Sequence, residues 1–298
     1  MSRRSVVVAV GVLAVMIVSG LVLAVYLAAS DSRGFAFGGR VALLEVDGMI
    51  TDDAPYLEQI RELRDDRSVR AFVVRVNSPG GVVGPAQSLY RELRRIRDED
   101  GRPVVASIGA TGASGGYYLA LGADSIFALP GSLTGSIGVI IEFPNVVGLM
   151  DKVGVRMEVV KSAEHKDIGS PFRPLGPADR EVLDGLVSDV YDQFIDAVAR
   201  ERDLPAAEVR RLADGRVLSG QQALEAGLVD RLGNLNDALA AAGGMAGLGD
   251  RPRLRRPARD GPTLLEVLLG RRVAGALARA ARPLEEGTGP RVQYRIPW

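Results

Sequence analysis

The stretch from Gly109 to Gly122 most restricts how this chain can fold; it reads Gly-Ala-Thr-Gly-Ala-Ser-Gly-Gly-Tyr-Tyr-Leu-Ala-Leu-Gly. A β-branched run at 103–108 precedes it, and an Ala/Leu/Tyr run with helical spacing follows it. Glycine permits a sharp bend, so the pattern predicts a strand-to-helix turn that lifts Ser114 clear of a sheet. Backbone N–H groups at the start of a helix can also bind an oxyanion. The stretch indicates either a nucleophilic serine or a packed glycine loop in which Ser114 is an N-cap.

Predicted strands and helices alternate through the first half of the chain. Strands are expected at 41–46, 69–76, 103–108, 125–129, 137–142 and 155–160, with helices at 54–63, 85–98, 115–121 and 145–153. This alternation predicts an α/β fold with a largely parallel sheet. The second half is helical, with one long amphipathic helix at 177–202 and shorter helices at 206–212, 221–226 and 235–242.

The first thirty residues have a different character. Residues 5–30 carry no charge and are mostly apolar. This stretch is long enough for a membrane-spanning helix, which needs about 20 apolar residues. Arg3 and Arg4 precede the segment and Asp31 follows it, so the N-terminus is expected in the cytoplasm and the rest of the chain beyond the membrane. A cleaved signal peptide is the competing interpretation, but its apolar region is normally only about 7–15 residues long. We expect an uncleaved anchor.

The composition excludes several kinds of site. The formal net charge is zero, which gives no electrostatic reason to expect a nucleic-acid partner. The chain has no cysteine, so disulfides, thiolate metal sites and cysteine nucleophiles are excluded. A single histidine, His165, excludes a multi-histidine metal site. The expected chemistry therefore uses no metal and no cofactor.

A nucleophilic serine needs a base, and the sequence offers two kinds. His165 follows Ser114 with carboxylates between them, so a Ser-Asp-His order is formally possible. Lysine is the alternative: of 37 basic Lys and Arg residues only Lys152, Lys161 and Lys166 are lysine, and all three fall within fifteen residues, with Lys161 and Lys166 after the last predicted strand. Arginine cannot accept the proton, because its pKa stays above about 12. Either chance in an arginine-rich chain or a catalytic role explains this cluster.

Acyl transfer also needs two N–H donors aimed at the developing oxyanion. The turn at 77–81, Asn-Ser-Pro-Gly-Gly, ends a predicted strand and has the flexibility that such a donor loop needs. Gly81, paired with Gly115 just after the serine, could complete the hole. The backbone after it, at Val82 and Val83, could pair with an extended substrate strand.

Four ordered motifs resemble a known family. They are Asn77–Gly81, Ala113–Tyr118, Thr134–Val139, and the lysine segment in which Lys161-Ser162 and Lys166-Asp167 precede Ser170–Arg173. Together they resemble the short, single-repeat form of signal peptide peptidase A, a membrane-anchored serine protease with a Clp-protease/crotonase-like fold, a spiral of strand-helix units. The resemblance covers about residues 40–240. It implies a Ser/Lys dyad in which Ser114 is the nucleophile and Lys166, rather than Lys161, the general base.

The resemblance also implies the remaining features of the site. The glycine turn matches the oxyanion loop, so Gly81 and Gly115 are the expected donors, and Ser136 lies in a segment expected to orient the lysine. A ring-shaped or dome-shaped homo-oligomer is implied, in which serine and lysine can come from neighbouring subunits. His165 departs from the pattern, since a glycine and an aromatic residue are expected in this segment; it places a titratable group beside the base.

The Gly-, Pro- and Arg-rich stretch 243–262 indicates a linker, and the apolar spacing at 263–280 indicates an amphipathic helix. The expected organisation is an anchor (1–30), a tether (31–39), a protease domain (40–246) and a C-terminal linker and amphipathic helix (247–298). The expected function is hydrolysis of extended peptides, such as remnant signal peptides or membrane-protein segments, outside the cytoplasm at the cell membrane. Two alternatives stay open. One is a crotonase-type acyl-CoA hydratase or isomerase, which the apolar N-terminus and the serine argue against. The other is a membrane-anchored peptide-binding scaffold with a degenerate site.

Overall fold

The computed structural model describes residues 39–258 and 293–295, together with Met16 and Ser19. The chain divides into two units, Met1–Gly39 and Arg40–Trp298, and the second contains the sheet and the helices that pack on it. Within the described residues, no helix combines the length and the apolar character that a membrane span requires. Apart from Met16 and Ser19, the segment expected as an anchor lies outside those residues.

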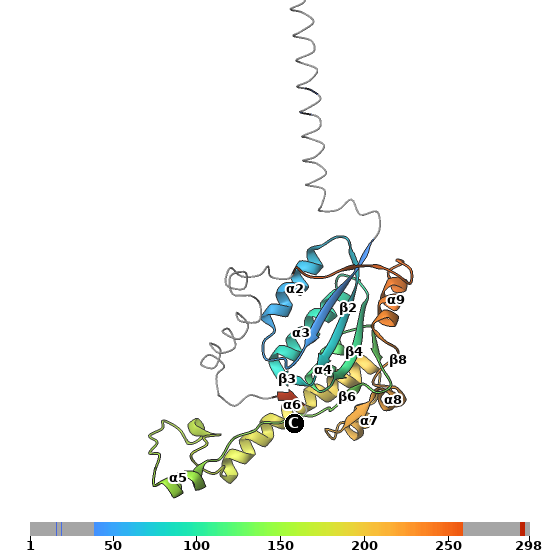
Figure 1. Ribbon diagram of the computed structural model, residues 1–298. Helices are drawn as coiled ribbons and strands as arrows, with labels where there is room; N and C mark the ends of the chain where they lie inside the picture. The colour runs from blue at the N-terminus through green and yellow to red at the C-terminus, as the bar shows by residue number, and fades with distance from the viewer. Residues whose placement is uncertain (1–15, 17–18, 20–38, 259–292, 296–298) are drawn as a thin grey trace, which may run out of the picture. The chain divides into compact units, whose positions relative to one another are not determined.

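A mixed sheet of eight strands forms the centre of this second unit (Figure 1). Its main path runs β7-β6-β4-β2-β1-β9, with β5 beside β4 and β8 beside β5. All its pairings are parallel except that of β6 with β7. The strands are β1 (Arg40–Asp47), β2 (Val69–Ser78), β4 (Val104–Gly112), β5 (Ser125–Ala128), β6 (Leu133–Gly135), β7 (Val217–Ser219), β8 (Arg231–Leu232) and β9 (Arg253–Arg255). The predicted α/β class with a largely parallel sheet is confirmed.

Helices cover both faces of the sheet because its central strands are apolar on both sides. On one face Leu44 and Val46 of β1 join a core with α2 (Ala54–Asp65), α3 (Val83–Asp98), α4 (Gly115–Ala120) and part of α6 (Pro177–Arg202). On the other face Leu43 packs with α9 (Leu235–Met245). Two further helices, α7 (Ala206–Leu212) and α8 (Gly220–Glu225), complete the helical second half.

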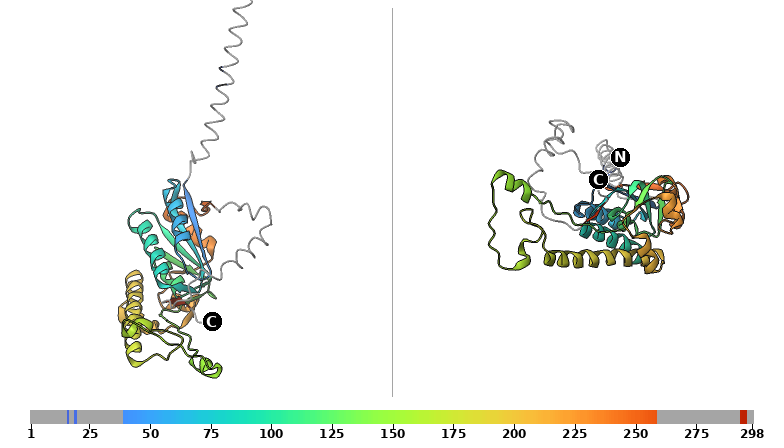
Figure 2. Two further views of the ribbon diagram at one scale, coloured as in Figure 1. Left: turned by 90° about the vertical axis from the view of Figure 1, so that its left-hand side faces the viewer. Right: turned by 90° about the horizontal axis from the view of Figure 1, so that it is seen from below.

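An extended segment projects from this body (Figures 1 and 2). We call residues 140–176 the arm; it contains α5 (Val147–Val153) and a 3-10 turn (Glu164–Asp167), and it leads into α6. The C-terminal half of α6 is buried at Phe194 and Val198, whereas Leu186 in its N-terminal half is 43% exposed. The predicted apolar stripe of this helix is therefore only partly covered within one chain.

Three expectations about secondary structure were wrong. Residues 155–160 have no regular structure, and 137–142 contain a single bridging residue. Their β-branched composition favours strands, but a strand also needs a neighbour, and the apolar side chains at 155–160 are exposed instead. The segment expected as a linker after Gly243 carries the end of α9 and β9, which pairs with Arg40–Ala42 of β1. The amphipathic helix expected at 263–280 lies outside the described residues.

Candidate active site

The predicted strand-to-helix turn is present between β4 and α4. Ser114 has φ 53° and ψ −117°, a backbone conformation that non-glycine residues rarely adopt. Its N–H donates to the carbonyl of Gly135 over 2.8 Å, and its carbonyl accepts from the N–H of Tyr118 over 2.8 Å. Strain of this kind persists only where the surroundings enforce it, and it concentrates at functional sites.

The glycine after the turn is required by a close backbone approach. A Cβ atom at Gly116 would lie 2.7 Å from the carbonyl oxygen of Ser78. That same carbonyl accepts a 3.0 Å hydrogen bond from the N–H of Ala113. The end of β2 is thus held directly against the turn that carries Ser114.

The hydroxyl of Ser114 is buried and makes no hydrogen bond within the described residues. The residue is 1% exposed, and its Oγ atom has no hydrogen-bond partner in the part of the chain that the structure describes. Ser114 occupies the N-cap position of α4, but its side chain makes no capping hydrogen bond. An unpaired buried hydroxyl costs about 1–3 kcal/mol, so its retention calls for a functional reason. This geometry favours a nucleophile over a structural cap.

The predicted oxyanion loop lies beside this turn. It forms a short strand, β3 (Gly80–Val82), and α4 packs against it. Ile50 holds one edge of β3: its N–H donates to Gly80 O over 2.9 Å and its carbonyl accepts from Val82 N–H over 2.7 Å. A Cβ atom at Gly81 would lie 2.1 Å from the Ile50 carbonyl oxygen, so only glycine fits there.

The direction of the Gly81 amide follows from these two bonds. In a trans peptide the C=O and the next N–H point in opposite directions, and the described residues contain no cis bond. Because Gly80 O and Val82 N–H both face Ile50, the N–H and C=O of Gly81 face the opposite edge of β3. The Gly115 N–H is at the first position of α4, where no intrahelical acceptor exists. Val83 begins α3, so the strand edge expected for substrate ends at Val82.

Ser136 lies one residue beyond the acceptor of the Ser114 N–H. It is 4% exposed, has φ 50°, and its own N–H donates to Arg216 O over 2.8 Å. The structure therefore brings the backbone of Ser136 close to that of Ser114. Sequence reasoning did not identify Gly135 or Ile50 as the partners that fix these segments, because backbone acceptors leave no signature in side-chain chemistry.

The two candidate lysines differ in their surroundings. Lys161 Nζ donates to Asp167 Oδ1 and to the carbonyl of Glu164, both over 2.8 Å, so its ammonium serves to hold the 3-10 turn together. Lys166 is exposed on that turn, and its side chain has no partner within the described residues. Since Ser114 Oγ has no hydrogen-bond partner either, one chain does not form the Ser114–Lys166 pair by itself.

His165 faces an acidic cluster rather than the serine. Its Nδ1 atom lies 3.5 Å from Asp179 Oδ1. Arg173 bonds to both Asp167 and Asp179, and these hydrogen bonds hold the pKa of each carboxyl well below its usual range. A Ser-His-Asp triad is therefore not assembled within the described chain.

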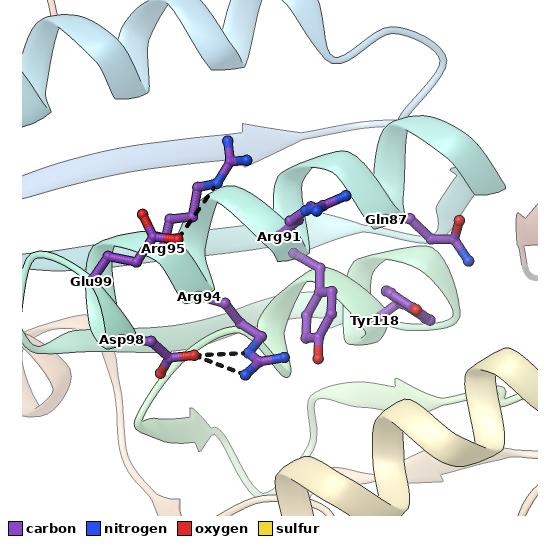
Figure 3. A pocket seen from close by; sticks show the side chains of 8 residues that line it. Gln87, Arg91, Arg94, Arg95, Asp98, Glu99 and Tyr118 are labelled. Carbon is purple, nitrogen blue, oxygen red and sulfur yellow. Dashed lines mark hydrogen bonds and ion pairs between the residues drawn. The ribbon is translucent and has the colours of Figure 1, made fainter.

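A separate surface hollow of about 490 Å³ lies on α3 and does not include Ser114 (Figure 3). Its arginines are mostly paired: Arg94 donates twice to Asp98, and Arg95 lies 3.9 Å from Glu99. Tyr118 of α4 forms part of the wall, and burial raises its pKa to about 12. The residues that line this hollow include no serine and no lysine, so it offers no nucleophile comparable to Ser114.

Comparison with known proteins identifies the family. Residues 96–248, roughly half of the chain, match peptidase family S49. The chain belongs to this family. The S49 match includes the Ser114 turn and the arm, and it makes the chain a serine protease. It removes the crotonase-type alternative.

Two relatives of this S49 protein show how far the likeness extends. A putative protease of Synechocystis sp. is 42% identical over 211 residues, which is 70% of this chain and 75% of that protein. A putative signal peptide peptidase SppA of Enterococcus faecium is 36% identical over 213 residues, 67% of this chain and 62% of that protein. The expected kinship with signal peptide peptidase A is confirmed.

A solved structure shares the fold of the S49 protein. A serine-to-alanine mutant of a membrane-bound stomatin-specific protease aligns with a TM-score of 0.50 and 16% identity, over 75% of this chain and 99% of its own. At this identity the likeness concerns the fold alone. It agrees with the expected Clp-protease-like architecture.

Proposed function

We propose that this S49 protein is a Ser/Lys-dyad endopeptidase in which Ser114 is the nucleophile and Lys166 of a neighbouring copy is the general base. The observation that carries the proposal is the buried, unpaired Ser114 hydroxyl on a strained turn between two sets of backbone donors. A serine in that position lacks only a base. Lys166, whose side chain has no partner among the residues that the structure describes, is the side chain we propose to supply it.

The proposed reaction proceeds through an acyl-enzyme. The neutral Lys166 amine takes the Ser114 hydroxyl proton as Oγ attacks the substrate carbonyl carbon. The Gly81 and Gly115 N–H groups receive the oxyanion, and the lysine proton passes to the leaving amine as the C–N bond breaks. Water then gives a proton to the same amine and attacks the ester carbon. The lysine returns this proton to Ser114 Oγ as the acyl C–O bond breaks, which releases the acid product and restores both the hydroxyl and the neutral amine. Ser136 orients the amine.

Assembly with a second copy is supported by the arm. Its exposed apolar side chains continue onto the uncovered half of α6; they are Leu149, Val153, Val155, Met157, Val159, Val160, Phe172, Val182 and Leu186. A set of exposed apolar groups this large is typical of a protein interface. A ring or dome of identical chains would cover them and bring Lys166 of one copy toward Ser114 of the next.

The proposed substrate is an extended peptide at the membrane. The edge of β3 that Gly81 faces can pair with a strand, which demands an unfolded segment. The uncharged run at 5–30 supports a single-pass anchor with the catalytic unit on the extracytoplasmic side. Remnant signal peptides and membrane-protein segments meet both conditions, and the E. faecium relative is named a putative signal peptide peptidase.

The proposal is tested with the full chain in detergent micelles. Ser114→Ala and Lys166→Ala should each abolish cleavage of unfolded casein, and Ser114→Ala should also abolish labelling by a fluorophosphonate probe. His165→Ala should stay active. Lys152→Ala is the matched control, because Lys152 is also exposed on the arm. Activity lost with His165→Ala but kept with Lys166→Ala would establish a histidine base instead. A wild-type chain that binds peptide but neither cleaves nor labels would be the degenerate scaffold.

A further inference from the structure

Four charged side chains form a closed cluster around the 3-10 turn that carries Lys166. We call this set the arm cluster; its members are Lys161, Asp167, Arg173 and Asp179. Arg173 lies at its centre: Nε and Nη2 donate to Asp167 over 3.0 and 2.9 Å, and Nη1 donates to Asp179. Lys161 Nζ donates to Asp167 over 2.8 Å. Two cations therefore face two carboxylates, and the arm cluster has no net charge.

The cluster also fixes the turn in place. Asp179 belongs to the first turn of α6, so Arg173 joins the turn that carries Lys166 to this helix. On the other side of the turn, a Cβ atom at Gly169 would lie 2.2 Å from the ring of Phe143. The chain after Lys166 is thus held between the helix and an aromatic ring.

Other titratable groups near this turn stand outside the balance of charge. His165 Nδ1 lies 3.5 Å from Asp179 Oδ1, and Glu164 and Arg180 are exposed residues that make no side-chain ion pair within the described chain. Histidine side chains commonly titrate between pH 5 and 8, so a measurement at about pH 9 keeps His165 in one state.

We propose that Arg173 is a positioning residue for the base: it fixes the turn of Lys166 and engages the carboxylates that would otherwise stabilise that lysine in its protonated form. The inference rests on the proposed function for the role of Lys166. A general base must be neutral to accept a proton, and a nearby unpaired carboxylate favours the ammonium. Arginine suits this task because its planar fork bonds two carboxylates at once, which a lysine ammonium does less well.

The first test measures how fast the Lys166 amine reacts with acetic anhydride at about pH 9. It uses the full chain with Ser114→Ala in micelles; only the neutral amine reacts, and mass spectrometry compares Lys166 with Lys152 on the same arm. Arg173→Gln should lower this ratio about threefold, because the cluster then carries one net negative charge. Arg180→Gln is the matched control: it removes an arginine next to Asp179 but outside the cluster, and should keep the ratio.

A second substitution separates charge balance from support of the fold. Arg173→Gln/Asp179→Asn leaves one cation and one carboxylate, Lys161 and Asp167, so the ratio should return to the wild-type value. A merely structural role would not be restored by removing a second member of the cluster. Lys161→Gln and Lys161→Gln/Asp167→Asn make the same comparison from the other side, should the first pair fail to fold.

Amine reactivity does not depend on catalysis, so this inference and the proposed function fail separately. With a fluorogenic peptide, Arg173→Gln should move the acid limb of the kcat profile to higher pH, and the added Asp179→Asn should move it back. Slower Lys166 labelling without any movement of the limb would count against Lys166 as the base. An unchanged ratio in Arg173→Gln and Lys161→Gln, or a loss that neither second substitution restores, would overturn the inference.

Discussion

The N–H of Ser114 donates a 2.8 Å hydrogen bond to the carbonyl of Gly135. This bond joins the strained turn after β4 to the end of β6. It therefore fixes the backbone of Ser114 beside that of Ser136. Both Ser114 and Ser136 have positive φ angles, which the surrounding hydrogen bonds enforce. The site is therefore built mainly from backbone contacts between short, distant segments.

The first prediction concerns the close approach at β3. Gly81→Ala should lower the free energy of unfolding by about 1–3 kcal/mol and reduce peptide hydrolysis, because the new methyl group overlaps the Ile50 carbonyl. Gly84→Ala is the control: no atom lies within 4 Å of its Cβ position in α3, and alanine gains about 1 kcal/mol of helix propensity. Urea unfolding and casein hydrolysis measure both. Equal stability of the two variants would show that β3 is not held as described.

The second prediction concerns Ser136 as the residue that orients the base. Ser136→Ala should lower kcat about tenfold, part of the about 10²- to 10⁴-fold that a general base contributes. The proposed hydrogen bond from the Ser136 hydroxyl favours the neutral form of the base, so its loss should move the acid limb of the kcat/KM profile to higher pH.

Ser132→Ala is the control, because it also removes a buried serine hydroxyl and so shows the effect of lost stability alone. The Ser132 hydroxyl is also buried, but it donates to Gly109 O over 2.6 Å and accepts from Leu129 N–H over 3.0 Å. This variant should lose stability and keep the acid limb in place. An unmoved limb in Ser136→Ala would remove that residue from the proposed mechanism.

The third prediction is a pH dependence of stability. Two 2.7 Å hydrogen bonds from the Arg64 guanidinium lower the pKa of Asp100 to about 2, from a usual value of 3.8. A lowered carboxyl pKa adds stability above the unfolded pKa, and this stability is lost as the pH falls toward the folded value. Asp100→Asn should thus lower the melting temperature at pH 7, and the difference from wild type should shrink between pH 4 and pH 2.

Thermal unfolding at several pH values checks this dependence. Glu99→Gln is the matched control, because Glu99 is 65% exposed and lies 3.9 Å from Arg95, so its melting temperature should stay near that of wild type at each pH. A difference for Asp100→Asn that grows on acidification would contradict the assignment.

The fourth prediction concerns the arm. Val155→Asp/Val159→Asp should reduce the oligomer mass measured by light scattering, and casein hydrolysis should fall in proportion. Both side chains are 52% exposed in one chain, so the fold of the body should keep its melting temperature. Val155→Thr/Val159→Thr, which keeps the shape without the charge, should perturb assembly less. An undiminished mass for the aspartate variant would place the interface elsewhere.

The sequence predicted the long periodic elements and the turn at Ser114, because local patterns determine them. The bounds of α6 and α7 match the predicted ranges, and the glycines around Ser114 indicated the bend between β4 and α4. Strands of two or three residues, such as β3, β6 and β8, were missed. So short a strand has almost no periodicity, and its existence depends on a partner distant in sequence.

The site was predictable to a similar extent. A serine beside a glycine turn could be recognised from residue types, and the fold brings Gly81 and Gly115 to neighbouring segments. Two features could not be recognised. The pairing of β10 (Gln293–Arg295) with β3 joins segments some 200 residues apart. The proposed relation of Lys166 to Ser114 depends on the arm, several of whose apolar side chains are exposed.

The most direct measurement mixes two inactive chains. Ser114→Ala and Lys166→Ala, carrying different affinity tags, are co-expressed, and assemblies containing both are isolated by two successive affinity steps. If serine and lysine come from neighbouring copies, random mixing gives about a quarter of the sites an intact pair. Casein hydrolysis should then return to about a quarter of the wild-type rate, although each variant alone is inactive. A mixed assembly of wild-type size that stays inactive would contradict the shared dyad.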